Sequence, residues 1–228
     1  MNRGIFVTGT DTDCGKTLVS VTLVRRLRAR GVRVAGFKPV AAGAVRRDGE
    51  LRNDDALALM AASRLDIPYA TVNPFCFAPA IAPHLAAAAQ GVKIESGPIQ
   101  AAFAELAADC EFLVVEGAGG WRVPLGSELD IQGLALALGL PILLVVGLRL
   151  GCINHALLSE QAILASGACL LGWIGSQVDP DMGYLNENII TLKSGLSRPC
   201  LGILPHPDAR QPLAQDVPLD IDRLLQGV

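Results

Sequence analysis

A short polar stretch near the start of the chain has the residue types of a phosphate-binding loop. It reads Gly9-Thr10-Asp11-Thr12-Asp13-Cys14-Gly15-Lys16-Thr17 and joins an apolar run to a segment with helical periodicity. Backbone N–H groups of such a loop and the N-terminus of the following helix attract phosphate oxygens. Gly15 permits close approach, the Lys16 ammonium can reach the β- and γ-phosphates, and the Thr17 hydroxyl can bind Mg²⁺. The strict pattern has glycine at position 10 rather than 9, so the stretch predicts nucleotide binding by a variant loop.

Two further charged residues end apolar runs of the chain. Lys38 stands directly before Pro39, and lysine occurs only four times in the sequence. Its compact ammonium suggests a point charge that stabilises an anion, although the residues alone fit an ordinary exposed lysine equally well. Glu116 ends the apolar run 112–115, where an unpaired carboxylate would be costly, so we expect a cation beside it, either Mg²⁺ or a basic side chain. Asp55 could serve the same metal or only the dipole of its helix.

These residues belong to an alternating pattern of strands and helices. Strands are predicted over residues 4–8, 32–38, 112–116, 141–146, 169–178 and 201–204. Helices are predicted over 16–30, 54–63, 97–108, 130–138, 154–166 and 184–193, with Ser96 and Asn154 as caps. The pattern predicts an α/β fold in one domain over residues 1–228, with a mostly parallel sheet and helices on both faces. Ligands of such sheets bind at the carboxyl ends of the strands, so the irregular stretches 41–53 and 69–93 are candidate functional loops.

The composition excludes several classes of protein. With 51% hydrophobic and 18% charged residues, the chain is not disordered. The longest apolar run, 134–148, is interrupted by Gly139 and Pro141 and is shorter than the ~20 residues of a membrane span. A net charge of -3 supplies no general attraction to nucleic acid or anionic membranes. Six dispersed cysteines without a C-x-x-C pair favour free thiols in a reducing compartment. We therefore expect a soluble cytoplasmic protein without a nucleic-acid or membrane partner.

In combination, the motifs resemble the dethiobiotin synthetase family, the ATP-dependent carboxylases of biotin synthesis. The resemblance spans nearly the whole chain. Its motifs are Gly9-Thr10-Asp11-Thr12, Gly15-Lys16-Thr17, Lys38-Pro39-Val40, Asn53 with Asp55-Ala56-Leu57, Val115-Glu116-Gly117-Ala118-Gly119-Gly120-Trp121 and Gly151-Cys152-Ile153-Asn154-His155. It implies a homodimeric P-loop NTPase-like fold. It also implies the conversion of 7,8-diaminononanoate, CO₂ and ATP into dethiobiotin, ADP and phosphate, through a carbamate and a carbamic–phosphoric anhydride.

The resemblance further implies a role for each matching residue. The catalytic residues would be Thr12, Lys16 and Lys38. ATP would be bound by Asp13, Cys14, Gly15, Lys16, Thr17, Leu18, Ser176, Gln177 and Pro205. The diamine would contact Lys38, Gly117, Ala118, Gly119, Gly120 and, from the partner subunit, Asn154. Mg²⁺ would be held by Thr17, Asp55 and Glu116.

The chain departs from the family pattern at three positions. Ala42 and Ala82 stand where the family commonly has a hydroxyl group, and Ser176 stands where relatives often place an asparagine that reads adenine. Nucleotide base preference is therefore left open by the sequence.

Two other functions compete with this interpretation. One is another ATP-dependent ligase of the P-loop group, such as a cobyrinate amidating enzyme, which usually carries a glutamine-hydrolysing domain that 228 residues leave no room for. The other is a P-loop switch ATPase acting with a partner protein or a membrane. Such a switch favours a basic amphipathic terminal helix, and residues 220–225 have no basic face.

Overall fold

Apolar runs of the chain form a six-stranded sheet in which every neighbouring pair of strands is parallel. The computed structural model describes residues 4–206 and 219–226. The strand order is β10-β9-β8-β1-β7-β2. The strands are β1 (Gly4–Gly9), β2 (Val34–Phe37), β7 (Phe112–Gly120), β8 (Ile142–Leu148), β9 (Leu170–Gln177) and β10 (Cys200–Leu204). The predicted parallel α/β sheet is confirmed.

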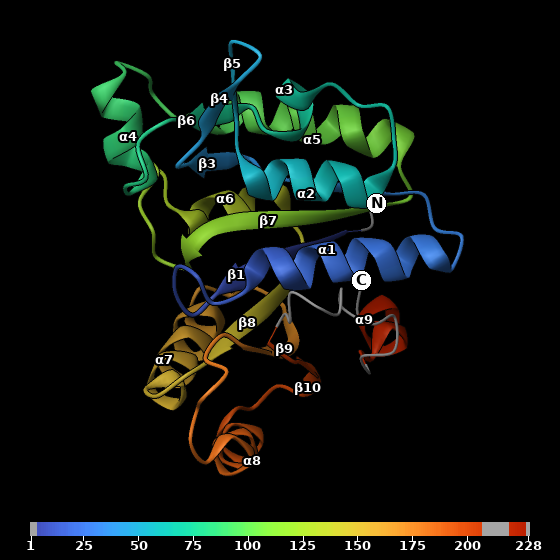
Figure 1. The fold of residues 1–228 in the computed structure, drawn as a ribbon, viewed down its shortest axis with the longest axis vertical. Coiled ribbons are helices and arrows are strands. Elements are labelled where there is room, and N and C mark those ends of the chain that lie inside the picture. Colours follow the sequence, from blue (N-terminus) through green and yellow to red (C-terminus); the bar gives the residue numbers. More distant parts are fainter. Residues whose placement is uncertain (1–3, 207–218, 227–228) are drawn as a thin grey trace.

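Helices cover both faces of this sheet (Figure 1). One face carries α1 (Lys16–Ala29), α2 (Asp54–Ser63) and α9 (Ile221–Gln226), which share one apolar cluster with the strands. The other face carries α5 (Ser96–Asp109), α6 (Ile131–Leu138), α7 (Cys152–Ala165) and α8 (Leu185–Gly195), which share the second cluster. Within residues 4–206 and 219–226, no helix is long and apolar enough to cross a bilayer.

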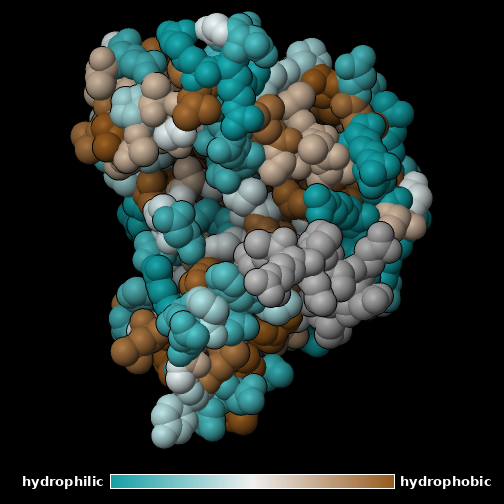
Figure 2. Space-filling model, in the orientation of Figure 1, coloured by the Kyte–Doolittle hydropathy of each residue, from teal (hydrophilic) through white to brown (hydrophobic). Residues whose placement is uncertain are grey.

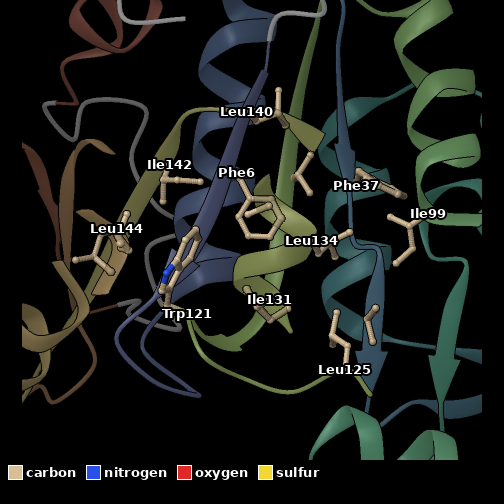
Figure 3. Packing of buried hydrophobic residues seen from close by; sticks show 14 of the residues in the cluster. Phe6, Phe37, Ile99, Trp121, Leu125, Ile131, Leu134, Leu140, Ile142 and Leu144 are labelled. Carbon is tan, nitrogen blue, oxygen red and sulfur yellow. The ribbon is translucent and has the colours of Figure 1, made fainter. Parts of the chain in front are cut away.

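The central strands are apolar throughout because both of their faces are covered. In β1, Ile5 and Val7 belong to the α1 side, whereas Phe6 belongs to the α6 side. Figure 3 shows the Phe6 ring in the second cluster, with Trp121 and Leu134 around it. Alternate side chains of one strand thus enter two different cores, which holds the strand ends in fixed register.

The two stretches predicted to be irregular contain short ordered elements, so that prediction was wrong in part. They are β3 (Val40–Ala42), β4 (Val45–Arg47), β5 (Glu50–Arg52), α3 (Tyr69–Val72), β6 (Phe75–Phe77) and α4 (Pro83–Ala89). β3 pairs with β6 in parallel, and β4 pairs with β5 as an antiparallel hairpin. Three-residue strands are too short to show a periodic pattern in the sequence.

Three predicted element ends also need correction. α7 begins at Cys152 after Gly151, whose φ of 96° is left-handed, so Asn154 lies within the first turn and is not the cap. β7 continues from Glu116 to Gly120, because Gly120 still pairs with Gly9 of β1. Ser96 is the first residue of α5 rather than its cap. The β7 end was misplaced because pairing with β1 continues through a glycine-rich stretch, and both helices begin earlier than predicted.

Close packing of α2 against β2 depends on Gly36. A Cβ at this position would lie 2.7 Å from Leu59 Cβ and 2.8 Å from Leu59 Cδ2, so α2 would have to move. We therefore expect Gly36→Ala to lower the free energy of unfolding by about 1–3 kcal/mol in urea titration. The matched control is Gly97→Ala in α5, where a Cβ meets nothing within 4 Å and alanine favours the helix. Equal stability of the two variants would contradict this packing argument.

Candidate active site

A cavity of about 880 Å³ opens at the carboxyl ends of the central strands. Its walls come from the loop between β1 and α1, the ends of β2, β7 and β9, and the segment from β3 to α4. In Figure 1 this edge lies on the left, where the arrow of β7 points and the chain passes from β1 into α1. Parallel strands bring all their carboxyl ends to one edge, which is where open α/β sheets bind ligands.

The phosphate loop is tightly packed around Gly15. This residue has a φ of 91°, and a Cβ built on it would lie 2.1 Å from Ser176 Oγ, so both its conformation and its surroundings require glycine. The Lys16 side chain folds back over the loop and donates to the Asp11 carbonyl oxygen at 2.8 Å. The ammonium is thus held beside the backbone that would face a phosphate group.

Cys14 lies beneath the loop rather than in the cavity. It is 1% exposed, and its atoms fill the space that a Cβ at Gly9 or Gly147 would need. Only the backbone of Cys14 is therefore placed to meet a nucleotide.

A partly buried charge cluster forms the floor of the cavity. We call Thr17, Lys38, Asp55 and Glu116 the charge cluster. The Lys38 ammonium lies 2.7 Å from Glu116 Oε1 and 2.9 Å from Asp55 Oδ2. The Thr17 hydroxyl lies 2.8 Å from Asp55 Oδ1 and 2.9 Å from Glu116 Oε1. Lys38 is 4% exposed and Glu116 is fully buried, so Lys38 is not an ordinary surface lysine, and it is the cation that Glu116 needs.

Opposite charges keep both members of the Lys38–Asp55 pair ionised. Burial lowers the pKa of Lys38, but attraction to Glu116 and Asp55 outweighs this effect, and the pKa is raised above its ordinary value. Burial likewise raises the pKa of Asp55, but Lys38 and the Thr17 hydrogen bond outweigh it, and the pKa is lowered. The cluster therefore holds one ammonium and an ionised Asp55 carboxylate beside Glu116.

The oxygen atoms of this cluster fit a magnesium ion. Mg²⁺ prefers hydroxyl and carboxylate oxygens, and Thr17, Asp55 and Glu116 present them within hydrogen-bond distance of one another. Glu116 Oε2 is buried and has no hydrogen-bond partner among the described residues. A buried carboxylate oxygen without a partner is unfavourable, so it has capacity for a further cation.

Most residues singled out in the sequence line the cavity. They are Thr12, Asp13, Gly15, Lys16, Thr17, Leu18, Lys38, Asp55, Glu116, Ala118, Gly119, Ser176 and Gln177. Besides Cys14, the others lie elsewhere. Gly117 and Gly120 are backbone of β7 packed close to β1, and Asn154 is exposed on α7. Pro205 is exposed, and its neighbour His206 lines the cavity instead.

Sequence reasoning missed a largely apolar part of the wall. It consists of Val40, Ala41, Ala80, Ile81, Pro83, Val123, Val178 and His206, together with Ala42 and Ala82, which the sequence analysis named only as departures. Apolar side chains carry no chemical signature of their own. The sole available signal was that several of them fall in the stretches 41–53 and 69–93, which were predicted to be functional loops.

Comparison with known proteins agrees with this geometry. Residues 3–212 match the family model of an AAA domain. The ATP-dependent dethiobiotin synthetase BioD of Pseudomonas aeruginosa (strain LESB58) is 48% identical over 98% of both chains. The synthetase of the same name from Xanthomonas oryzae pv. oryzae (strain PXO99A) is 52% identical over 90% of this chain and 92% of its own.

The fold has relatives at much lower sequence identity. A ParA family ATPase from Chlorobium tepidum TLS has a TM-score of 0.58 over 100% of this chain and 90% of its own, at 13% identity. That likeness concerns the fold, which is of the P-loop NTPase type. The function is inferred from the synthetases, which are far more similar in sequence. Nearly half of the residues are identical to those of the synthetases along almost the entire chain, so this protein belongs to the ATP-dependent dethiobiotin synthetase family.

Proposed function

We propose that this protein closes the ureido ring of dethiobiotin from 7,8-diaminononanoate, CO₂ and ATP. The observation that carries the proposal is the buried Lys38 ammonium, which lines the same cavity as the phosphate loop in a chain of this family. An ammonium at this place can bind an anion that forms next to the γ-phosphate of ATP. Carbamate, the product of amine and CO₂, is such an anion.

The cations of the cavity suit the first step of this chemistry. An alkyl amine attacks CO₂ only when neutral, and a pKa of ~10.4 makes its deprotonation at pH 7 cost about 4–5 kcal/mol. Lys16 and Lys38 would lower the pKa of a bound amine by repulsion between like charges. The same charges would stabilise the carbamate and the phosphoryl group in transfer.

The later steps need no nucleophile from the protein. A carbamate oxygen attacks the γ-phosphorus of ATP, ADP leaves, and a mixed anhydride forms. The second amine of the substrate then attacks the carbonyl carbon, phosphate leaves, the attacking nitrogen loses a proton, and the ring is closed. The protein would bind and orient these groups, with Lys38 on the carbamate and Lys16 and Thr12 on the phosphates.

The remaining wall of the cavity would hold the other parts of the substrates. The apolar stretch from β3 to α4 suits the alkyl chain of the diamine, and the segment from Gly117 to Gly120 would pack beside it. Ser176, Gln177 and Pro205 would contact the nucleotide base. Ala42 and Ala82 lack hydroxyl groups, and each missing hydrogen bond would weaken binding by about 0.5–1.5 kcal/mol.

We also propose that Thr17, Asp55 and Glu116 hold Mg²⁺. When bound, this ion neutralises negative charge on the triphosphate. The support is the oxygen donor set and the unpartnered Oε2 of Glu116.

A homodimer belongs to the same proposal. Exposed apolar side chains gather on α7, α8 and the turn before α7, and Figure 2 shows brown side chains at the lower left over this region. They are Leu150 (92% exposed), Leu157 (41%), Leu158 (56%) and Ile190 (63%). Asn154 is exposed on α7, and we propose that a second copy packs on this face and receives Asn154 near its own site. We propose a cytoplasmic location because all six cysteines are free thiols, as is usual for proteins of a reducing compartment.

One assay separates this function from a P-loop switch ATPase. Phosphate release from ATP should rise when diaminononanoate and bicarbonate are added, with one dethiobiotin formed for each phosphate. Omitting the diamine supplies the control. ATP hydrolysis at the same rate with and without the diamine would favour the switch ATPase and sink the synthetase proposal.

Replacement of Lys38 tests its role on the carbamate. Lys38→Gln should reduce ring closure at least ~100-fold while nucleotide still binds, because the phosphate loop is intact. The change also leaves Glu116 without a cation, which can cost about 3–5 kcal/mol of stability. Lys38→Arg keeps the charge but not the compact ammonium, so it should fold and still turn over slowly. Lys93→Gln, at a lysine whose side chain is 70% exposed, is the control, and normal turnover of Lys38→Arg and Lys38→Gln would remove Lys38 from the mechanism.

Two neighbouring aspartates test the magnesium site. Asp55→Asn should raise the Mg²⁺ concentration for half-maximal phosphate release by about tenfold, the equivalent of ~1.5 kcal/mol of charge-assisted interaction. The control is Asp54→Asn, because Asp54 is one residue away, its side chain is 78% exposed, and it pairs with Arg47. An equal Mg²⁺ requirement in the two variants would argue against Asp55 as a ligand.

A further inference from the structure

A chain of hydrogen bonds behind the charge cluster joins the two backbone segments that carry Lys38 and Asp55. The Tyr69 hydroxyl accepts the backbone N–H of Asn53 at 2.7 Å and donates to Asn73 Oδ1 at 2.8 Å. Asn73 Nδ2 in turn donates to the Lys38 carbonyl oxygen at 2.6 Å. One hydroxyl group therefore connects the start of α2 to the backbone of Lys38.

On the side of α2, Tyr69 completes the helix cap. Asn53 is the N-cap, and its side-chain oxygen accepts the N–H groups of Asp55 at 3.1 Å and Ala56 at 3.3 Å. In a capping box the third helical residue is Glu or Gln and reaches back to the N–H of the cap. Here that residue is Ala56, which has no such group, and the hydroxyl of Tyr69 takes the N–H of Asn53 instead. Asp55 is thus fixed at the second position of a helix whose start is held by Tyr69.

On the side of Lys38, Asn73 uses its whole amide group. Its Nδ2 donates to the carbonyl oxygens of Lys38 and Phe75, and its Oδ1 accepts from Tyr69. Asn73 is 2% exposed, so water cannot reach its amide group, and the loss of any of these bonds would be costly. The backbone N–H of Lys38 donates to the Val72 carbonyl oxygen at 2.9 Å. Both polar backbone groups of Lys38 are therefore held by the segment that begins at Tyr69.

Tyr69 itself is held in place as a neutral donor. The Arg52 guanidinium lies over its ring, 4.3 Å from the centroid. Burial, together with a hydrogen bond to Cys76, raises the pKa of Tyr69 well above its ordinary value, so the hydroxyl keeps its proton. A phenylalanine at this position would keep the ring and its contact with Arg52 but would lose the hydroxyl's bonds to Asn53, Asn73 and Cys76.

We infer that Tyr69 is a positioning residue for the proposed reaction, because its hydroxyl fixes the distance between the Lys38 ammonium and the Asp55 carboxylate. That distance is 2.9 Å in the structure. The inference rests on the proposed function for its effect on turnover. Reactions that depend on the exact position of charged side chains are sensitive to small changes in that position, and a displacement of ~1 Å can lower the rate about 100-fold.

Kinetics of Tyr69→Phe test this role. We expect kcat for dethiobiotin formation, per folded enzyme, to fall about 10- to 100-fold, while KM for ATP stays within about twofold of its normal value. A purely structural role would lower the melting temperature without this split between kcat and KM. The matched control is Tyr184→Phe, because Tyr184 is the second tyrosine of the chain and is 80% exposed. A kcat within about twofold of wild type in Tyr69→Phe would overturn the inference.

A crystallographic measurement keeps this test independent of the proposed function. If the wild-type protein shows no diamine-dependent phosphate release, the proposed function fails, and the structure of Tyr69→Phe alone decides the positioning role. The separation of Lys38 Nζ and Asp55 Oδ2 should then exceed the wild-type value of 2.9 Å by roughly 1 Å. An unchanged separation in that variant would contradict the inference.

Discussion

The fully buried carboxylate of Glu116 is the constraint on which the site depends. A carboxylate without a cation in such a place is strongly destabilising, and breaking a buried pair costs about 3–5 kcal/mol. Strand register supplies the cation: Phe37 of β2 pairs with Val115 of β7, so the next residues along the strands are Lys38 and Glu116. Val7 of β1 pairs with Glu116 itself. The phosphate loop, which begins at Gly9, therefore starts just beyond the same point. The sheet thus places nucleotide loop, ammonium and carboxylate at one level.

Asp55 reaches this level by a different route, from the start of a helix rather than from a strand end. The close contact between Gly36 and Leu59 sets how near α2 lies to β2. The cap at Asn53 and the hydroxyl of Tyr69 set where α2 begins. Packing therefore fixes the distance of the helix from the sheet, and hydrogen bonds fix its start. Both are needed for a carboxylate that must lie within 3 Å of both Lys38 and Thr17.

The sequence predicted the parts of this site that lie within one continuous segment better than the contacts between distant segments. Lys16 and Thr17 are recognisable because the whole phosphate loop is contiguous in the chain, and the order of strands and helices followed from apolar runs. The Lys38–Glu116 pair spans 78 residues and depends on β2 lying next to β7, which no local pattern reveals. Asn154 was predicted as a cap because the left-handed turn at Gly151 has no signature beyond a glycine. Tyr69 was missed because its partners, Asn53 and Asn73, lie in stretches without periodicity.

The charge cluster would also let one cavity hold two amines in opposite protonation states. The proposed reaction needs Lys38 as an ammonium and the substrate amine as a neutral nucleophile. Glu116 and Asp55 both contact Lys38, and their attraction raises its pKa. A substrate amine in the same cavity would also face Lys16, whose ammonium contacts a carbonyl oxygen rather than a carboxylate. Repulsion from Lys16 would lower the pKa of that amine, whereas attraction to Glu116 and Asp55 raises the pKa of Lys38. In the proposed reaction, the proton would therefore stay on Lys38, which would bind the carbamate, and would leave the substrate amine, which would form it.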